Sequence, residues 1–138
     1  SNNSKNIVTH DGICEQCIFL NNLNDLKSIN DYNRADVVII EEAQFFKDLY
    51  TFIKLELELQ TKDFIIIGLS GDFQMNPIGD IIKMIPLADH IEHLTGFWYQ
   101  CKNGTPGSFT RRISNHSEKI VIGEKDIYEC VCRKHFYI

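Results

Sequence analysis

The chain has 138 residues and a formal net charge of −5 at pH 7, and its basic residues do not gather in one block. This length suits one domain with a hydrophobic core and, at most, a small appendage. The acidic balance argues against a nucleic-acid polymer as partner, and no run approaches the roughly 20 apolar residues that cross a membrane. The first residues also lack the pattern of a signal peptide, so we expect a soluble, cytoplasmic protein.

The first predicted element is an amphipathic helix over residues 14–29 (CEQCIFLNNLNDLKSI), after a turn at Asp11 and Gly12. Cys14 and Cys17 within it have the spacing of a zinc knuckle. Because no second pair lies near them in the sequence, we interpret both as part of a buried helix face.

Two apolar runs rich in Val and Ile, residues 36–40 and 63–69, predict strands that are buried on both faces. Strands of this kind are usually parallel. The segment between them is ambiguous, because IKLELELQ alternates like a strand while other apolar residues recur at helical spacing. We predict a helix, since two parallel strands need a crossover connection.

Further along, residues 78–84 predict a short helix that Pro86 stops. From Thr95 onward the chain holds its single Trp, a Gly/Pro loop and three of its five cysteines. We therefore predict two parts, an α/β core over residues 1–94 and a small β-rich appendage over residues 95–138.

Two adjacent acids, Glu41 and Glu42, follow the first predicted strand. Ligands of an open parallel sheet bind at the carboxyl ends of its strands. Paired carboxylates at that position suit phosphoryl transfer, in which one organises Mg²⁺ and the other acts as a base. The competing interpretation is a strand that simply enters solvent through two charged residues.

The neighbours of these acids favour the first interpretation. In chain order they are VVIIEEAQFF, GLSGDF, PLADHIEHLTG, FTRR, VIGE, a tyrosine and VCRKH. The ordered series resembles the thymidine kinases that combine a P-loop domain with a zinc-binding lasso domain. The resemblance implies an α/β fold with a RecA-like P-loop kinase core, a parallel sheet and a small β-rich, zinc-ribbon-like lasso subdomain. It also implies ATP- and Mg²⁺-dependent phosphorylation of the 5′-hydroxyl of thymidine or deoxyuridine.

The resemblance assigns a role to individual residues. Glu42 matches the catalytic base, and Glu41 stands where the family has the aspartate that supports Mg²⁺ beside ATP. Phe45 matches the aromatic residue that stacks on the thymine ring. The other implied nucleoside-binding residues are Leu69, Phe73, Thr110, Val121, Gly123 and Tyr128. For the apolar residues among them, the competing interpretation is ordinary core.

A zinc site is implied in the appendage. Cys132 and His135 have the spacing of two ligands of one Zn²⁺, and the resemblance adds Cys101 as a third. Trp98 replaces the remaining cysteine of the family, so the fourth ligand would be Cys130, water or a neighbouring subunit. The alternative is a metal-free appendage with buried thiols.

The sequence contains no G-x-x-x-x-G-K-[ST] loop to bind phosphates. Two interpretations follow: the chain is part of an active thymidine kinase, or it is a non-catalytic nucleoside-binding or scaffold protein that keeps the fold. An ATPase unrelated to nucleosides is a third. The resemblance further implies a homotetramer, with Leu55 and Leu59 buried between subunits.

Overall fold

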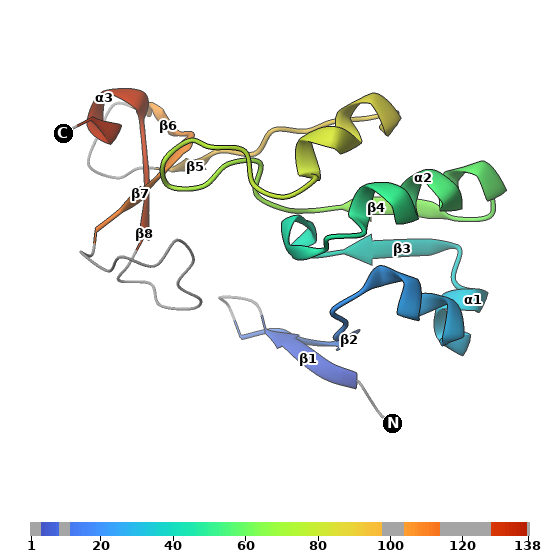
Figure 1. Cartoon of the computed structure of the whole chain (residues 1–138). Coiled ribbons are helices and arrows are strands. Elements are labelled where there is room, and N and C mark those ends of the chain that lie inside the picture. Colours follow the sequence, from blue (N-terminus) through green and yellow to red (C-terminus); the bar gives the residue numbers. More distant parts are fainter. Residues whose placement is uncertain (1–3, 9–11, 98–103, 114–127, 138) are drawn as a thin grey trace. The chain divides into compact units, whose positions relative to one another are not determined.

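The computed structural model describes residues 4–8, 12–97, 104–113 and 128–137. These residues form short helices and small two-stranded sheets (Figure 1). The chain divides into two compact units, and we describe each by itself. Unit 1 comprises residues 1–68 and 79–83, and unit 2 comprises residues 69–78 and 84–138. The division near residue 94 into a kinase core and an appendage stays a prediction.

Unit 1 starts with an antiparallel hairpin and continues through short helices into a parallel strand pair (Figure 1). Its elements are β1 (Ser4–Val8), β2 (Cys14–Ile18), η1 (Leu23–Ser28), α1 (Asn30–Arg34), β3 (Val37–Ile40), η2 (Ala43–Phe45), α2 (Leu49–Leu59) and β4 (Asp63–Ile66).

The β3–β4 pair confirms the predicted parallel strands. Val37 is in register with Asp63, and Ile40 with Ile66, at the two ends of the pair. Helix α2 forms the crossover between the strands, as the connection rule predicts. The carboxyl ends of both strands therefore lie at the same edge.

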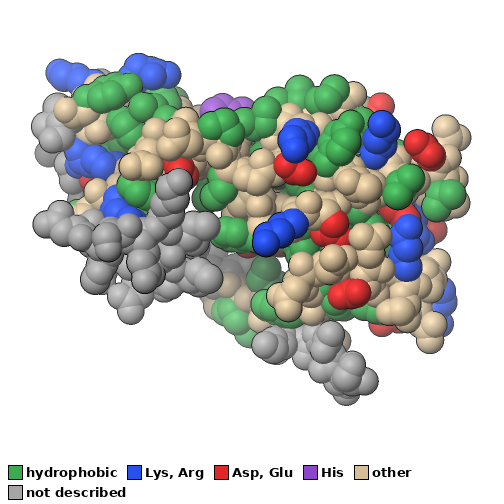
Figure 2. Space-filling model, in the orientation of Figure 1, with side chains coloured by type: hydrophobic (Ala, Val, Ile, Leu, Met, Phe, Trp, Pro, Cys, Tyr) green, Lys and Arg blue, Asp and Glu red, His purple; other side chains and the backbone are tan. Residues whose placement is uncertain are grey.

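Helix α2 covers one face of this strand pair. The Phe52 and Phe64 rings are 6.4 Å apart and meet edge to face, and Leu49 and Ile53 are fully buried. Side chains on the opposite face are exposed, with 64% of Ile39 and 49% of Ile65 accessible. The prediction that both faces are buried is therefore wrong for the described residues, because only one face has a helix over it. Figure 2 shows hydrophobic side chains at the molecular surface among charged ones.

The helix predicted over residues 14–29 is also wrong in its first half. Residues 14–18 form strand β2, which pairs residue by residue with β1. Gly12, shortly before this strand, has a left-handed φ of 81°, a backbone conformation that glycine adopts without strain. Cys14 is exposed on this strand and not part of a buried helix face. The helical part begins only at Leu23, as the 3-10 turn η1.

Unit 2 is β-rich in the part of the appendage that the structure describes, as predicted. Its strands are β5 (Gly96–Phe97), β6 (Pro106–Gly107), β7 (Phe109–Arg112) and β8 (Tyr128–Val131), followed by α3 (Arg133–Phe136). The predicted helix over residues 78–84 is instead the 3-10 helix η3 (Ile81–Leu87), which includes Pro86; its first three residues belong to unit 1 and the rest to unit 2.

The core of unit 2 forms where β7, β8 and α3 meet. Val131 and Cys132 are buried, and Phe109 and Phe136 pack against them with ring centroids 5.9 Å apart. The Arg133 guanidinium lies 4.4 Å from the centroid of Phe109.

Among the described helices, none is long and apolar enough to cross a membrane.

Candidate active site

Glu41 and Glu42 directly follow β3 at the carboxyl edge of the parallel pair. The backbone ladder continues past them, because Ile67 N–H donates to Ile40 O (2.9 Å) and Ala43 N–H donates to Ile67 O (3.0 Å). Both acids are exposed. Their place at the end of a parallel strand agrees with the prediction. The prediction of a central strand is wrong for the described residues, because β3 pairs with β4 alone and the sheet has two strands. A cleft in front of the acids stays a prediction.

Glu42 has an unusual backbone and a fixed side chain. Its φ of 53° and ψ of 38° are left-handed, which costs a non-glycine residue energy and is often found at functional sites. The Gln44 side-chain amide donates a hydrogen bond of 2.5 Å to Glu42 Oε2. Gln44 itself is buried, with 4% of its surface exposed.

Two glycines make room for Gln44. A Cβ on Gly68 would lie 2.4 Å from Gln44 Oε1, and a Cβ on Gly79 would lie 2.1 Å from the Gln44 carbonyl oxygen. Gly79 also has a left-handed φ of 56°. Larger residues at these positions would displace Gln44.

Phe45 lies on η2, three residues after Glu42, and 48% of it is exposed. It is therefore not a core residue of unit 1. An exposed aromatic ring that follows two carboxylates within a few residues suits stacking on a flat base. That role for Phe45 stays a prediction.

In unit 2, a short loop carries Phe73. The Asp72 carboxylate accepts hydrogen bonds of 2.9 Å from the backbone N–H groups of Gln74 and Asn76. A bridge between Gly71 and Pro77 closes the loop. The loop is thereby fixed by its own hydrogen bonds.

Strands β7 and β8 bring a second aromatic residue to Phe73. The rings of Phe73 and Tyr128 have centroids 6.3 Å apart. The Arg112 guanidinium lies 4.3 Å from the Phe73 centroid and 5.3 Å from the Tyr128 centroid. Arg112 also donates a hydrogen bond of 2.8 Å to the Tyr128 hydroxyl. Two predicted nucleoside-binding residues are thus brought together, with an arginine that contacts both.

Of the other predicted nucleoside-binding residues, the structure describes Leu69 and Thr110. Leu69 is 53% exposed, and Thr110 is half-buried on β7, opposite Cys130 in the β8 register. Val121 and Gly123 lie outside the described residues. Convergence of the unit 1 and unit 2 residues on one nucleoside pocket stays a prediction.

Two of the predicted zinc ligands are neighbours. Cys132 Sγ lies 3.1 Å from His135 Nδ1. One Zn²⁺ with bonds of about 2.3 Å to sulfur and about 2.0 Å to nitrogen can bridge such a pair. Cys101 lies outside the described residues, among which there is no group of three potential metal ligands. The thiol of Cys130 donates to Gly107 O (2.6 Å), so it is engaged elsewhere.

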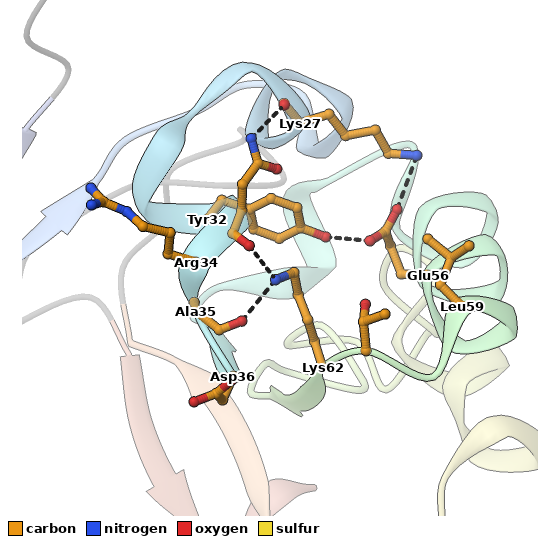
Figure 3. Close-up of a pocket in the computed structure, with 10 residues that line it drawn as sticks. Lys27, Tyr32, Arg34, Ala35, Asp36, Glu56, Leu59 and Lys62 are labelled. Atoms are coloured by element: carbon orange, nitrogen blue, oxygen red, sulfur yellow. Dashed lines mark hydrogen bonds and ion pairs between the residues drawn. The ribbon is translucent and has the colours of Figure 1, made fainter.

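The structure also has a pocket of about 430 Å³ at the amino-terminal ends of β3 and β4 (Figure 3). The Tyr32 hydroxyl donates to buried Glu56 Oε2 (2.5 Å), and Lys27 Nζ lies 3.0 Å from Glu56 Oε1. Lys62 donates to Ala35 O (2.7 Å). Tyr32, Lys27 and Glu56 satisfy one another's polar groups. The lining of the pocket therefore contains a polar network that joins α2 to α1 and η1.

Gln44 and Arg112 are the site residues that the sequence analysis missed. Gln44 stands in the quoted EEAQFF motif, two residues after Glu42, and Arg112 in the quoted FTRR motif. Their contacts become visible only in the folded chain. The sequence holds one signal for the packing of Gln44, the glycines Gly68 and Gly79 that leave room for it. They lie 24 and 35 residues further along the chain, so the link is not visible in the sequence.

Comparison with known proteins matches the chain to the family model described as thymidine kinase over residues 1–136. A thymidine kinase of Oryza sativa subsp. japonica is 36% identical over 94% of this chain and 48% of its own length. Thymidine kinase a of Arabidopsis thaliana is 38% identical over 94% of this chain and 55% of its own length. The thymidine kinase of Yaba monkey tumor virus is 36% identical over 96% of this chain and 71% of its own length. The chain thus spans about half the length of the plant relatives. It belongs to the thymidine kinase family.

Proposed function

We propose that the protein is a thymidine kinase, which transfers the γ-phosphate of ATP to the 5′-hydroxyl of thymidine or deoxyuridine. Membership of the family supports this proposal, and one observation carries it to the site. Glu42 lies at the carboxyl edge of a parallel strand pair, with its carboxylate held by Gln44. A general base needs this kind of defined position.

In this mechanism Glu42 accepts the proton of the nucleoside 5′-hydroxyl as the hydroxyl oxygen attacks the γ-phosphorus of ATP. The bond between that phosphorus and the β-phosphate oxygen breaks, and ADP leaves. Glu41 would face Mg²⁺, which when bound neutralises charge on the phosphates. Exposed carboxylate oxygens at a strand end suit this hard cation. Catalysis then rests mainly on positioning the two substrates and on neutralising charge.

The nucleoside base is proposed to lie against flat side chains. Phe45 would stack on the thymine ring, and Phe73 with Tyr128 would form a second wall. Leu69, Thr110, Val121 and Gly123 complete the proposed contacts. The flat rings suit a pyrimidine because they offer apolar area with little conformational freedom to lose.

For the fold, we propose a RecA-like core over residues 1–94 and a lasso over residues 95–138. Zn²⁺ at Cys101, Cys132 and His135 would stabilise the lasso. A homotetramer in the cytoplasm is proposed on the same grounds. The exposed Leu55 and Leu59 on α2 are candidates for a subunit contact.

A phosphorylation assay on the intact protein tests the proposed function. With ATP and Mg²⁺, thymidine and deoxyuridine should be converted to their monophosphates, and deoxycytidine should not. Binding of thymidine without any product in the presence of ATP would instead show a non-catalytic nucleoside-binding protein. Absence of both binding and turnover would refute the assignment of the nucleoside.

A further inference from the structure

We propose that Gln44 is a positioning residue for Glu42, which fixes the carboxylate so that one oxygen faces the substrate hydroxyl. The inference rests on the proposed function, because it assigns Gln44 a role in the same proton transfer. It begins with the hydrogen bond of 2.5 Å between Gln44 Nε2 and Glu42 Oε2.

Chemistry sets the orientation of the Gln44 amide. An ionised carboxylate can only accept hydrogen bonds, so the nitrogen of the amide must face Glu42. The bond occupies Oε2, and the substrate proton is therefore expected at Oε1. Since an amide carries no charge, it orients the carboxylate without adding a cation that would oppose protonation.

The backbone between the two residues is equally constrained. Phe45 N–H donates to Glu42 O (3.1 Å), and Ala43 N–H donates to Ile67 O at the end of β4 (3.0 Å). The left-handed conformation of Glu42 brings its side chain back toward Gln44 within two residues. A side-chain bond across such a turn holds Glu42 although its carboxylate is exposed.

The surroundings of Gln44 leave it little room to move. Gly68 lies against its amide oxygen and Gly79 against its carbonyl oxygen, at distances that exclude a Cβ at either position. The Gln44 side chain is also buried. Its conformational freedom is therefore already lost in the folded protein, so holding Glu42 costs little further entropy.

An NMR experiment tests the contact without altering Gln44 or requiring activity. The side-chain amide resonance of Gln44 is measured in the 138-residue chain, in its Glu42→Gln variant and in a Glu41→Gln control. The resonance should move in Glu42→Gln, where the charged acceptor is lost, and stay in place in Glu41→Gln. An unchanged resonance in Glu42→Gln would overturn the inference.

Kinetics of the intact protein test the role. Gln44→Met keeps an unbranched side chain and removes the donor, so kcat should fall about tenfold to a hundredfold. The KM for thymidine should stay within about threefold, because Gln44 is not among the proposed nucleoside contacts. Gly79→Ala should lower kcat in the same way by displacing Gln44. Its control is Gly12→Ala, at another left-handed glycine where a Cβ would have open space.

The outcomes separate this inference from the proposed function. If the wild type phosphorylates thymidine but Gln44→Met keeps its kcat, the positioning role is wrong and the proposed function stands. If kcat and thymidine affinity fall equally, Gln44 is structural and the inference is again overturned. If the wild type phosphorylates no nucleoside, both fail together.

Discussion

The Tyr32 hydroxyl on helix α1 donates a hydrogen bond of 2.5 Å to the Glu56 carboxylate on helix α2 (Figure 3). Both side chains are buried, and the second carboxylate oxygen of Glu56 contacts Lys27. A buried carboxylate is tolerated only when donors surround it. This bond therefore joins the crossover helix to the preceding helix on the side of unit 1 remote from Glu42.

Tyr32→Phe should destabilise the protein, because it removes one donor and leaves the charge of Glu56 buried. The expected loss in the free energy of unfolding is about 1.5–3 kcal/mol, the range for hydrogen bonds to charged groups. Chemical denaturation measures it. Tyr50→Phe, on the partly exposed face of α2, is the matched control and should change stability by less than about 0.5 kcal/mol. Equal effects of both variants would show that the Tyr32 hydroxyl contributes nothing specific.

The stability of the protein should fall in acid partly through Glu56. Burial alone raises the pKa of Glu56, but hydrogen bonds from Tyr32 and Lys27 and the charges of Lys27 and Lys62 outweigh it. The pKa therefore lies below its ordinary value of 4.5. A lowered pKa in the folded state means that the ionised group stabilises the fold above pH 4.5, and that this contribution is lost as the pH falls through the lowered pKa.

Unfolding measured from pH 7 downward in wild type and Glu56→Gln checks this dependence. The difference in stability between the two should be largest at neutral pH and shrink below the ordinary pKa of 4.5. A difference that stays constant into acid would contradict the assigned charge of Glu56. Burial and the contact with Glu56 meanwhile raise the pKa of Tyr32, so this hydroxyl remains a donor across the whole range.

The sequence predicted the parts of the fold that depend on local pattern. The Val/Ile runs gave β3 and β4, and the need for a crossover gave α2. The strand at Cys14–Ile18 was missed because its pairing with β1 outweighs the helical spacing of its own residues. Whether both faces of a strand are covered depends on other elements, so the exposed face with Ile39 could not be predicted from the strand alone.

The candidate site, like the fold, was predicted only in its local features. Glu41 and Glu42 were placed correctly after β3, since a strand end is a local feature. The contacts of Gln44 with Glu42 and of Arg112 with Tyr128 were not predicted. Gln44 has room only because Gly79 lacks a Cβ, and Arg112 also contacts Phe73 in the loop around Asp72. These contacts join residues that only folding brings together.

Arg112→Lys should weaken thymidine binding about three- to tenfold. Lysine keeps the charge but loses the planar guanidinium that stacks on Phe73 and bonds the Tyr128 hydroxyl. Calorimetric titration of thymidine into the protein measures the change. Arg133→Lys is the matched control, because Arg133 makes a similar contact with Phe109 in the same unit. If the two variants bind thymidine alike, Arg112 has no special part in the nucleoside site.

Purified protein should contain about one zinc per chain, and Cys132→Ser should lose most of it, because a hydroxyl is a poor replacement for a thiolate ligand. Elemental analysis gives the ratio. Cys14→Ser, at an exposed thiol on β2, should retain the metal. A content below about a tenth of a zinc per wild-type chain would show that Cys132 and His135 contact each other without a metal.

The turnover of Glu42→Gln in the intact protein, measured together with its affinity for thymidine, tests most directly whether Glu42 is the base. A general base acts in the transition state, so kcat should fall about a hundredfold or more while thymidine affinity stays within a few fold. Glu58→Gln, at an exposed acid on α2, should leave both unchanged. A Glu42→Gln variant that phosphorylates thymidine at the wild-type rate, or that loses binding and turnover equally, would contradict Glu42 as the base.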